Sequence, residues 1–199
     1  GGRLTVLTAI DQRIRAASPS VGGSGYLYSD ITGVPGSARR MQADRELYDA
    51  TLDCKNYWPR IECPLLFLGA TNDFNSPMEK VLRGFRSLPQ DNGALSFTPH
   101  MNHRFTTDNY AARVRWFETH LKGTFAFPKP AAARLDLETD DGTARFTMYP
   151  DLSGPHRLES VAVFYGYDRD PRVRFWRSAE VVRVTSASER DIAAFAWAN

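Results

Sequence analysis

The feature that most constrains the fold is an apolar run, CPLLFLGA (63–70), which ends three residues before a lone acid, Asp73. A strand that is apolar on both faces needs cover from other elements on each side. This pattern is typical of an inner strand of a parallel sheet between helices. The sequence SPME (76–79) follows and predicts a capping box with Pro77 at the first helical position, so that a helix should begin there.

Strands and helices alternate over residues 1–127, which predicts an α/β fold class. ALSFTP (94–99) predicts a second strand, and the following helix should end at Gly123. Its buried face is predicted to consist of Tyr110, Val114, Phe117 and Leu121. Further elements are expected as a helix over 3–10, a strand over 14–20 and a helix over 37–57 with Met41, Leu47 and Leu52 buried.

The segment FAFPKPAAA (125–133) reads as a linker, and beyond it the hydrophobic period changes to two. Asp141-Gly142 predicts a tight hairpin, and strands are expected over 160–167 and 172–184. We therefore expect two domains. The first, an α/β domain with a parallel sheet, covers 1–127, and the second, a small all-β, sandwich-like domain, covers 128–199.

Composition excludes several function classes. A net charge of +2 over 199 residues gives no reason to expect nucleic acid or an acidic membrane surface as a partner. No apolar run approaches the roughly 20 residues needed to span a bilayer. Cys54 and Cys63 form no disulfide framework, and unpaired thiols are the favoured interpretation. No metal-ligand spacing and no cofactor fingerprint occur, so neither a metal nor a cofactor is expected. The sequence contains no pattern that indicates an oligomeric state or a cellular compartment.

Two residues can carry chemistry beyond the ends of consecutive strands. Asp73 follows the strand over 63–70, and His103 follows the strand over 94–99. In open parallel sheets reactive groups collect at this edge, and an acid followed by a histidine is the chain order of Ser…Asp…His hydrolases. His100 competes with His103, which is favoured by its neighbours in NHRF.

The other candidates have ordinary explanations. His120 and His156 are expected to be structural or exposed. The acidic residues over 44–53 fit a solvated helix face or a cap over the site, since no metal spacing accompanies them. The segment RVRFWR (172–177) could stack on a sugar or a nucleic acid, but an alternating strand with one apolar face is preferred.

Three segments resemble the C-terminal half of an α/β-hydrolase of the dienelactone hydrolase, acetyl xylan esterase and prolyl oligopeptidase type. CPLLFLGATNDF (63–74) resembles the seventh strand with its acid, and FTPHMNHRF (97–105) resembles the eighth strand with the catalytic histidine. GGRLTVLTAIDQRIRAASPSVGG (1–23) resembles the helix after the nucleophile elbow and the next strand. The resemblance implies that Asp73 and His103 are the acid and the base of a catalytic triad.

The resemblance also implies where the nucleophile lies. Gly1-Gly2 resembles the end of the elbow motif G-x-S-x-G, which would put the serine two positions before Gly1. Ser24 and Ser37 do not fit the motif. The expected function of the parent protein is hydrolysis of a carboxylic ester, with a small-molecule or sugar ester as substrate, while the chain alone should be inactive. The alternatives are a serine peptidase of prolyl-oligopeptidase type and a non-catalytic interaction module.

Overall fold

A computed structural model describes residues 1–25, 45–89, 91–140, 142–168, 170–185 and 193–198. The chain divides into two compact units. The first consists of Gly1–Phe125 together with Tyr167–Phe175, and the second consists of Ala126–Gly166 together with Trp176–Asn199. Met41, Ser37 and much of the helix expected over 37–57 lie outside the described residues.

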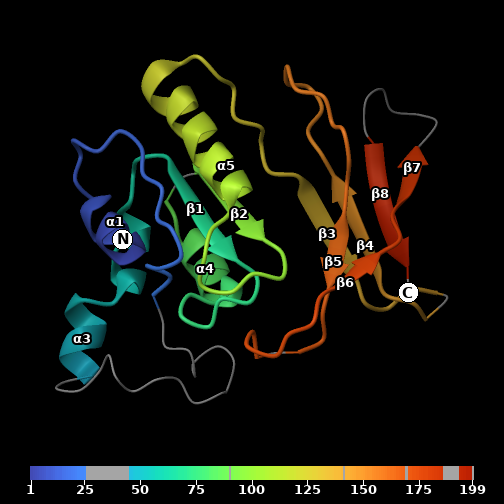
Figure 1. Cartoon of the computed structure of the whole chain (residues 1–199), viewed down its shortest axis with the longest axis horizontal. Helices are drawn as coiled ribbons and strands as arrows, with labels where there is room; N and C mark the ends of the chain where they lie inside the picture. The colour runs from blue at the N-terminus through green and yellow to red at the C-terminus, as the bar shows by residue number, and fades with distance from the viewer. Residues whose placement is uncertain (26–44, 90, 141, 169, 186–192, 199) are drawn as a thin grey trace. The chain divides into compact units, whose positions relative to one another are not determined.

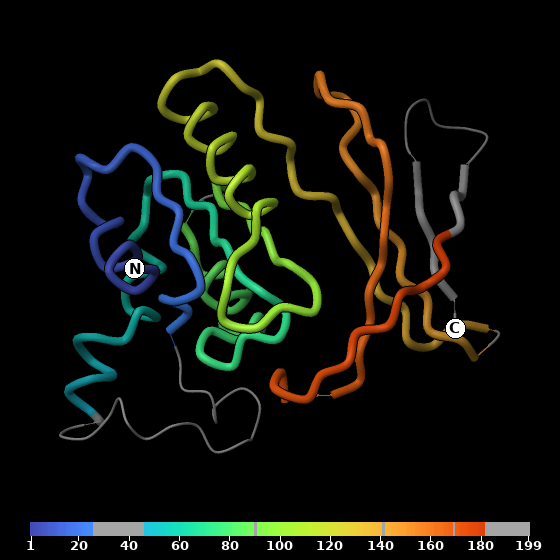
Figure 2. The backbone as a smooth tube through the Cα atoms, in the orientation of Figure 1, coloured from blue at the N-terminus to red at the C-terminus, as the bar shows by residue number. Residues whose placement is uncertain are grey.

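Parallel strands form the centre of the first unit (Figure 1). β1 (Leu65–Ala70) pairs in parallel with β2 (Gly93–Thr98), and all six residues of β1 are buried. On its other side, β1 is bridged in parallel by Ala17 and Ser20, which belong to an extended segment drawn in blue in Figure 2. The predicted strands over 63–70 and 94–99 are thus confirmed, as is the α/β class of this unit.

The core of the first unit lies on one face of these strands. Leu65 and Phe67 of β1 point into it and meet Trp58, whose ring stacks on Phe67 with 6.2 Å between centroids. Helices α1 (Gly2–Thr8) and α4 (Met78–Phe85) add Val6 and Val81. Because side chains alternate along a strand, Leu66 and Leu68 point to the opposite face. Helix α5 (Thr107–Phe117) packs against β1 and β2.

The predicted buried face of α5 is wrong. Tyr110, Val114 and Leu121 are 53%, 39% and 56% exposed, whereas Asn109 and Trp116 are buried. The inward face is partly polar because Asn109 is tied to β2. Its Oδ1 accepts from Thr98 Oγ1 at 2.7 Å, and its Nδ2 donates to Ser96 Oγ at 3.0 Å. A hydrophobic period alone could not identify an asparagine as the anchor of the helix.

Both ends of α5 have recognisable caps. The helix begins after Thr106, which forms a capping box with Asn109. It continues into a π-helical turn, η4 (Glu118–Lys122), and closes at Gly123, whose φ of 66° lies in the left-handed region. The predicted end at Gly123 is confirmed.

The segment after residue 44 forms three short helices. These are α3 (Arg45–Thr51), η2 (Cys54–Asn56) and η3 (Trp58–Arg60). Leu47 and Leu52, predicted to be buried, are 59% and 49% exposed. Cys54 and Cys63 are buried and unpaired, as expected, and burial raises the pKa of both thiols, that of Cys54 to about 11.

The second unit is built of strands. β3 (Ala132–Asp136), β4 (Arg145–Tyr149), β8 (Ala193–Ala198) and β7 (Val182–Thr185) form an antiparallel sheet in that order. β5 (Val163–Tyr165) pairs with β6 (Arg177–Ala179).

Two details of the second half differ from the prediction. The connection from β3 to β4 is longer than a two-residue turn, although Gly142 has the positive φ of 72° that a turn requires; Asp141 lies outside the described residues. Residues 172–173 belong to a turn of the first unit, and residues 174–175 follow it without regular structure, so none of the four lies in a strand. In the part of the chain that the structure describes, no helix combines the length and apolar character needed to cross a bilayer.

Candidate active site

The loop after β1 holds Asp73 in a fixed, fully buried position. Its side chain is 0% exposed, and Oδ1 accepts hydrogen bonds from the backbone N–H groups of Asn75 at 2.8 Å and Ser76 at 2.9 Å. The capping box predicted over 76–79 is wrong, since Pro77 is the N-cap of α4 and makes no side-chain cap. The chain turns around the Asp73 carboxylate instead, which fixes one of its oxygens.

The loop after β2 is joined to the Asp73 loop by the backbone. The N–H of His100 donates to Thr71 Oγ1 at 3.0 Å, and the N–H of Asn72 donates to the carbonyl of Met101 at 2.9 Å. His100 has a φ of 61°, a left-handed conformation that is uncommon for a residue other than glycine. This turn reverses the chain and directs the next residues, including His103, toward Asp73.

Asp73 and His103 are in hydrogen-bond contact. His103 Nδ1 lies 3.0 Å from Oδ1 and 3.0 Å from Oδ2 of Asp73. An ionised carboxylate can only accept, so Nδ1 must carry the proton, and in neutral imidazole Nε2 is then an acceptor. The ring is 41% exposed, and among the described residues Nε2 has no hydrogen-bond partner. The pair can therefore take a proton at Nε2 while the buried carboxylate stabilises the resulting imidazolium.

The remaining histidines lie in other surroundings. His100 is exposed and uses its backbone, not its ring, in the contact with Thr71. The His120 ring packs on Trp116 with 4.1 Å between centroids, and partial burial lowers the pKa of His120. His156 Nε2 lies 2.5 Å from the carbonyl oxygen of Ala126.

Arg174 contacts both sides of the Asp73 loop, a role that the sequence did not reveal. Its carbonyl accepts from Asn72 Nδ2 at 2.6 Å, and its Nη2 lies 2.5 Å from Oε1 of Glu79 in the first turn of α4. About a hundred residues separate the partners, so no local pattern could signal the contact. The preferred interpretation of RVRFWR as a strand is wrong for this residue, which is buried directly after a turn.

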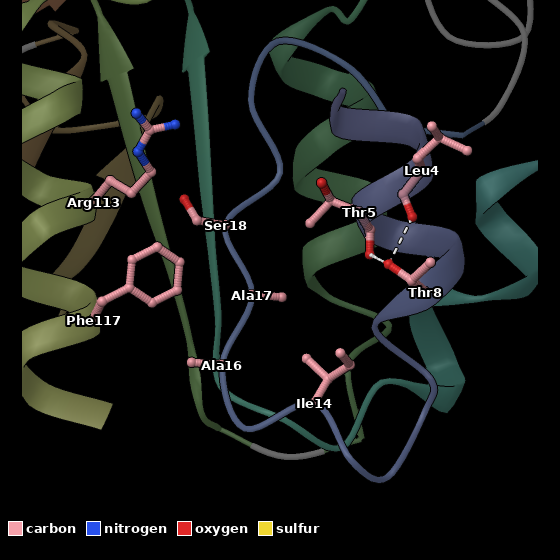
Figure 3. A pocket seen from close by; sticks show the side chains of 9 residues that line it. All are labelled: Leu4, Thr5, Thr8, Ile14, Ala16, Ala17, Ser18, Arg113 and Phe117. Atoms are coloured by element: carbon pink, nitrogen blue, oxygen red, sulfur yellow. Dashed lines mark hydrogen bonds between the residues drawn. The ribbon is translucent and has the colours of Figure 1, made fainter. Parts of the chain in front are cut away.

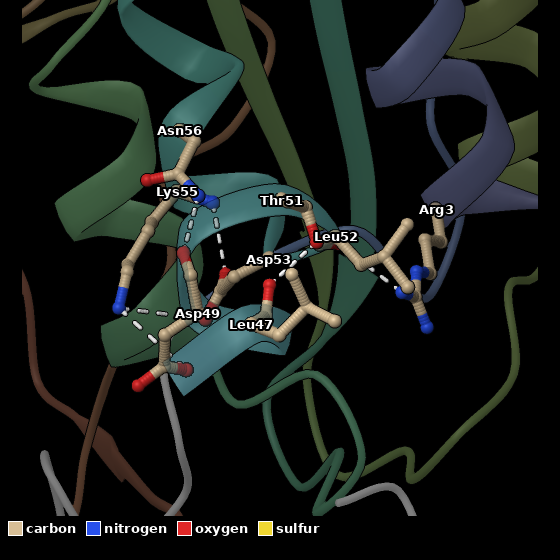
Figure 4. A network of polar contacts seen from close by, with 8 residues as sticks. All are labelled: Arg3, Leu47, Asp49, Thr51, Leu52, Asp53, Lys55 and Asn56. Atoms are coloured by element: carbon tan, nitrogen blue, oxygen red, sulfur yellow. Dashed lines mark hydrogen bonds and ion pairs between the residues drawn. The ribbon is translucent and has the colours of Figure 1, made fainter. Parts of the chain in front are cut away.

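Asp49 and Asp53 of the acidic segment belong to a network of polar contacts, whereas Asp44 lies outside the described residues (Figure 4). Asp53 is 2% exposed and accepts from the N–H of Lys55 at 2.9 Å. The Lys55 ammonium lies 3.8 Å from both Asp49 and Asp53, and Arg3 of α1 donates to the carbonyl of Leu52. In the described ranges no three His, Cys, Asp or Glu side chains gather in a way that could hold a metal ion.

A pocket of about 460 Å³ lies apart from the Asp73–His103 pair. Figure 3 shows the extended segment 16–18 in its centre, with Arg113 and Phe117 of α5 on one side and side chains of α1 on the other. Its lining is mostly apolar and contains no carboxylate, histidine or cysteine. Its hydroxyl groups come from Thr5, Thr8 and Ser18, but the lining offers no base that could activate one of them for acyl transfer.

Comparison with known proteins finds similarity to solved structures only. No family model matches the sequence, and no curated protein matches it. A solved Mycobacterium tuberculosis puromycin-hydrolyzing peptidase matches with a TM-score of 0.50 and 17% identity, over 60% of this chain and 21% of that one. A 2,6-dihydroxy-pseudo-oxynicotine hydrolase matches with a TM-score of 0.49 and 17% identity, over 65% of this chain and 40% of that one. A Paleococcus ferrophilus monoacylglycerol lipase matches with a TM-score of 0.44 and 15% identity, over 60% of this chain and 65% of that one.

The chain spans less than two thirds of the length of each of these structures. At such identities the similarity is evidence for the fold alone. About 60% of this chain has the fold of part of an α/β-hydrolase.

Proposed function

We propose that the protein containing this chain hydrolyses carboxylic esters, with His103 as general base and acid and Asp73 as the residue that orients it. The observation that carries the proposal is the 3.0 Å contact between His103 Nδ1 and the buried Asp73 carboxylate, while Nε2 has no hydrogen-bond partner among the described residues. The α/β-hydrolase fold of this region supports it, because such sheets carry a triad at this edge.

In the proposed reaction a serine hydroxyl attacks the ester carbonyl while His103 Nε2 takes its proton. The same proton passes to the departing alcohol as the tetrahedral intermediate collapses to an acyl-enzyme. Water then attacks the acyl-enzyme with His103 again as base, which releases the acid and restores the serine. Asp73 keeps the proton of neutral His103 on Nδ1 throughout.

We propose that the nucleophile is the serine that the elbow-like Gly1-Gly2 places two positions upstream. Ser24 is buried, and Ser37 lies outside the described residues. A fluorophosphonate probe should label the full-length protein on one serine, in the peptide that runs into Gly1. Labelling of Ser24, or no labelling of folded protein, would contradict this assignment.

Substitution of the pair tests the proposal. In the full-length protein, Asp73→Asn and His103→Gln should each lower kcat/KM for p-nitrophenyl esters by about 10³- to 10⁴-fold, because the base loses its tautomer or is absent. Circular dichroism would verify folding. The matched control is His100→Gln, which should keep the rate within about twofold. A fully active Asp73→Asn variant would rule out the proposed mechanism.

A second candidate is a serine peptidase of prolyl-oligopeptidase type. It is favoured by the similarity in fold to a puromycin-hydrolyzing peptidase. A panel of p-nitrophenyl esters and aminoacyl anilides, assayed on full-length protein, separates the two by which substrate class has the higher kcat/KM. If neither class is turned over and no serine is labelled, the fold serves as a non-catalytic interaction module.

A further inference from the structure

The segment Tyr167–Phe175 packs with the first unit although its chain neighbours on both sides belong to the second. Its conformation is fixed locally. The N–H of Val173 donates to the carbonyl of Asp170 at 3.2 Å, which closes a turn with Pro171 in the second position. The Asp170 side chain also accepts from the backbone N–H of Arg172 at 3.0 Å. The turn therefore presents the next residue, Arg174, in a defined direction.

Arg174 is the buried charged residue of this segment among those that the structure describes. Its side chain is 6% exposed, whereas Val173 and Phe175 on either side are 70% and 64% exposed. Nε donates to the carbonyl of Asp168 at 2.7 Å, which holds the guanidinium against its own segment. Nη2 lies 2.5 Å from Glu79 Oε1. The buried cation is thus paired and hydrogen-bonded, as a buried charge must be.

The two contacts from Arg174 reach opposite ends of the loop that holds Asp73. Asn72 precedes the acid and donates from Nδ2 to the Arg174 carbonyl, while its Oδ1 accepts from Thr71 Oγ1 at 3.0 Å. Glu79 follows the acid in α4, and its second oxygen is buried with no hydrogen-bond partner among the described residues. The guanidinium of Arg174 thus places a positive charge directly beside the Glu79 carboxylate.

We propose that Arg174 is a positioning residue that braces the Thr71–Glu79 loop and so fixes the Asp73 carboxylate against His103. The segment from the C-terminal half is then part of the candidate site. The effect on turnover rests on the proposed function, whereas the effect on the loop does not.

Hydrogen exchange of the folded protein tests the brace. The amides of Asn75 and Ser76 donate to Asp73 Oδ1, so their protection reports whether the carboxylate stays in place. In Arg174→Met their exchange should accelerate at least about tenfold, while the β1 amides of Leu66 and Leu68 change by less than about twofold. A merely structural role would accelerate all four together through global unfolding, and that result, or no change at all, would overturn the proposal.

Three further variants sharpen the test. Arg174→Lys keeps the charge and should recover part of the protection, and Glu79→Gln removes the ion pair from the other side should Arg174→Met fail to fold. Arg172→Met is the matched control, because its ion pair with Asp170 is local and its side chain is 49% exposed. Its exchange at Asn75 and Ser76 should stay within about twofold of the unsubstituted protein.

In full-length enzyme, Arg174→Met should lower kcat about tenfold with KM within about twofold. Rapid exchange together with unchanged kcat would overturn the positioning role. If the full-length protein turns over no ester or anilide, the proposed function fails, but the exchange comparison still decides whether Arg174 braces the loop.

Discussion

Strands β1 and β3 show how differently the two units are built. All six residues of β1 are buried, between the core on one face and the opposite side that α5 covers. In β3 the first four residues are exposed, and Leu135 is 56% exposed. Among the residues whose side chains the structure describes, every buried apolar side chain belongs to the first unit.

The difference between the two strands shows that a sequence pattern can predict a strand without predicting that its side chains are buried. Alternation of apolar and polar residues predicts an extended chain with one apolar face, but that face is buried only where a second layer covers it. β1 has such layers on both sides. We therefore expect stability to depend strongly on the first unit and weakly on β3 and its neighbours.

The largest expected effect comes from matched leucines in the two units. Leu66→Ala removes a fully buried side chain of β1 and should lower the free energy of unfolding by about 2–5 kcal/mol, through lost apolar burial and the cavity left behind. Leu137→Ala, at a position 70% exposed, should change it by less than about 0.5 kcal/mol. Urea unfolding measures both, and equal losses would break the comparison.

A matched pair of glycines should give a smaller effect. A Cβ on Gly2 would lie 2.3 Å from the carbonyl oxygen of Gly22 and 2.5 Å from that of Ser20, both on the backbone. Gly2→Ala should therefore lower the free energy of unfolding by about 1–3 kcal/mol, because α1 and the segment over 20–22 must move apart. Gly154, in the second unit, has open space around it. Thermal melting should show a clear drop in Tm for Gly2→Ala and none for Gly154→Ala. An unchanged Tm for Gly2→Ala would show that α1 does not pack this closely.

The smallest effect is a pH dependence in the core of the first unit. Burial raises the pKa of Cys54 from 9.0 to about 11, so the folded protein holds this proton more tightly than the unfolded chain does. Stability from this thiol is complete below pH 9 and is lost as the pH rises from 9 to 11. Between pH 9 and 11 the free energy of unfolding of the unsubstituted protein should fall by about 1–2 kcal/mol more than that of the Cys54→Ala variant. Parallel losses in the two proteins would contradict the burial of this thiol.

Continuous apolar runs made the central strands predictable. β1 and β2 lie within about two residues of their expected bounds, because such runs fit few other structures. The inward face of α5 was not predictable, since it is anchored by the polar side chain of Asn109. SPME has the residues of a capping box, but Glu79 is instead drawn into an ion pair with Arg174. Tertiary contacts decided both cases.

The same distinction applies to the candidate site. Asp73 and His103 follow consecutive strands, so parallel pairing of those strands brings their loops together, and the sequence was enough to predict that the two side chains meet. Neither Asn72 nor Arg174 had an identifiable role, because their contact joins residues about a hundred positions apart. Local sequence predicts the turn over 170–173, but not that Arg174, the next residue, contacts the loop that holds Asp73.

The most direct test of the central claim is the tautomer of His103, measured by long-range ¹H–¹⁵N NMR correlation on the folded protein at a pH where the ring is neutral. If Asp73 orients His103, the proton resides on Nδ1, and Asp73→Ala removes that preference. A proton on Nε2 in the unsubstituted protein, or a spectrum unaffected by Asp73→Ala, would contradict the account.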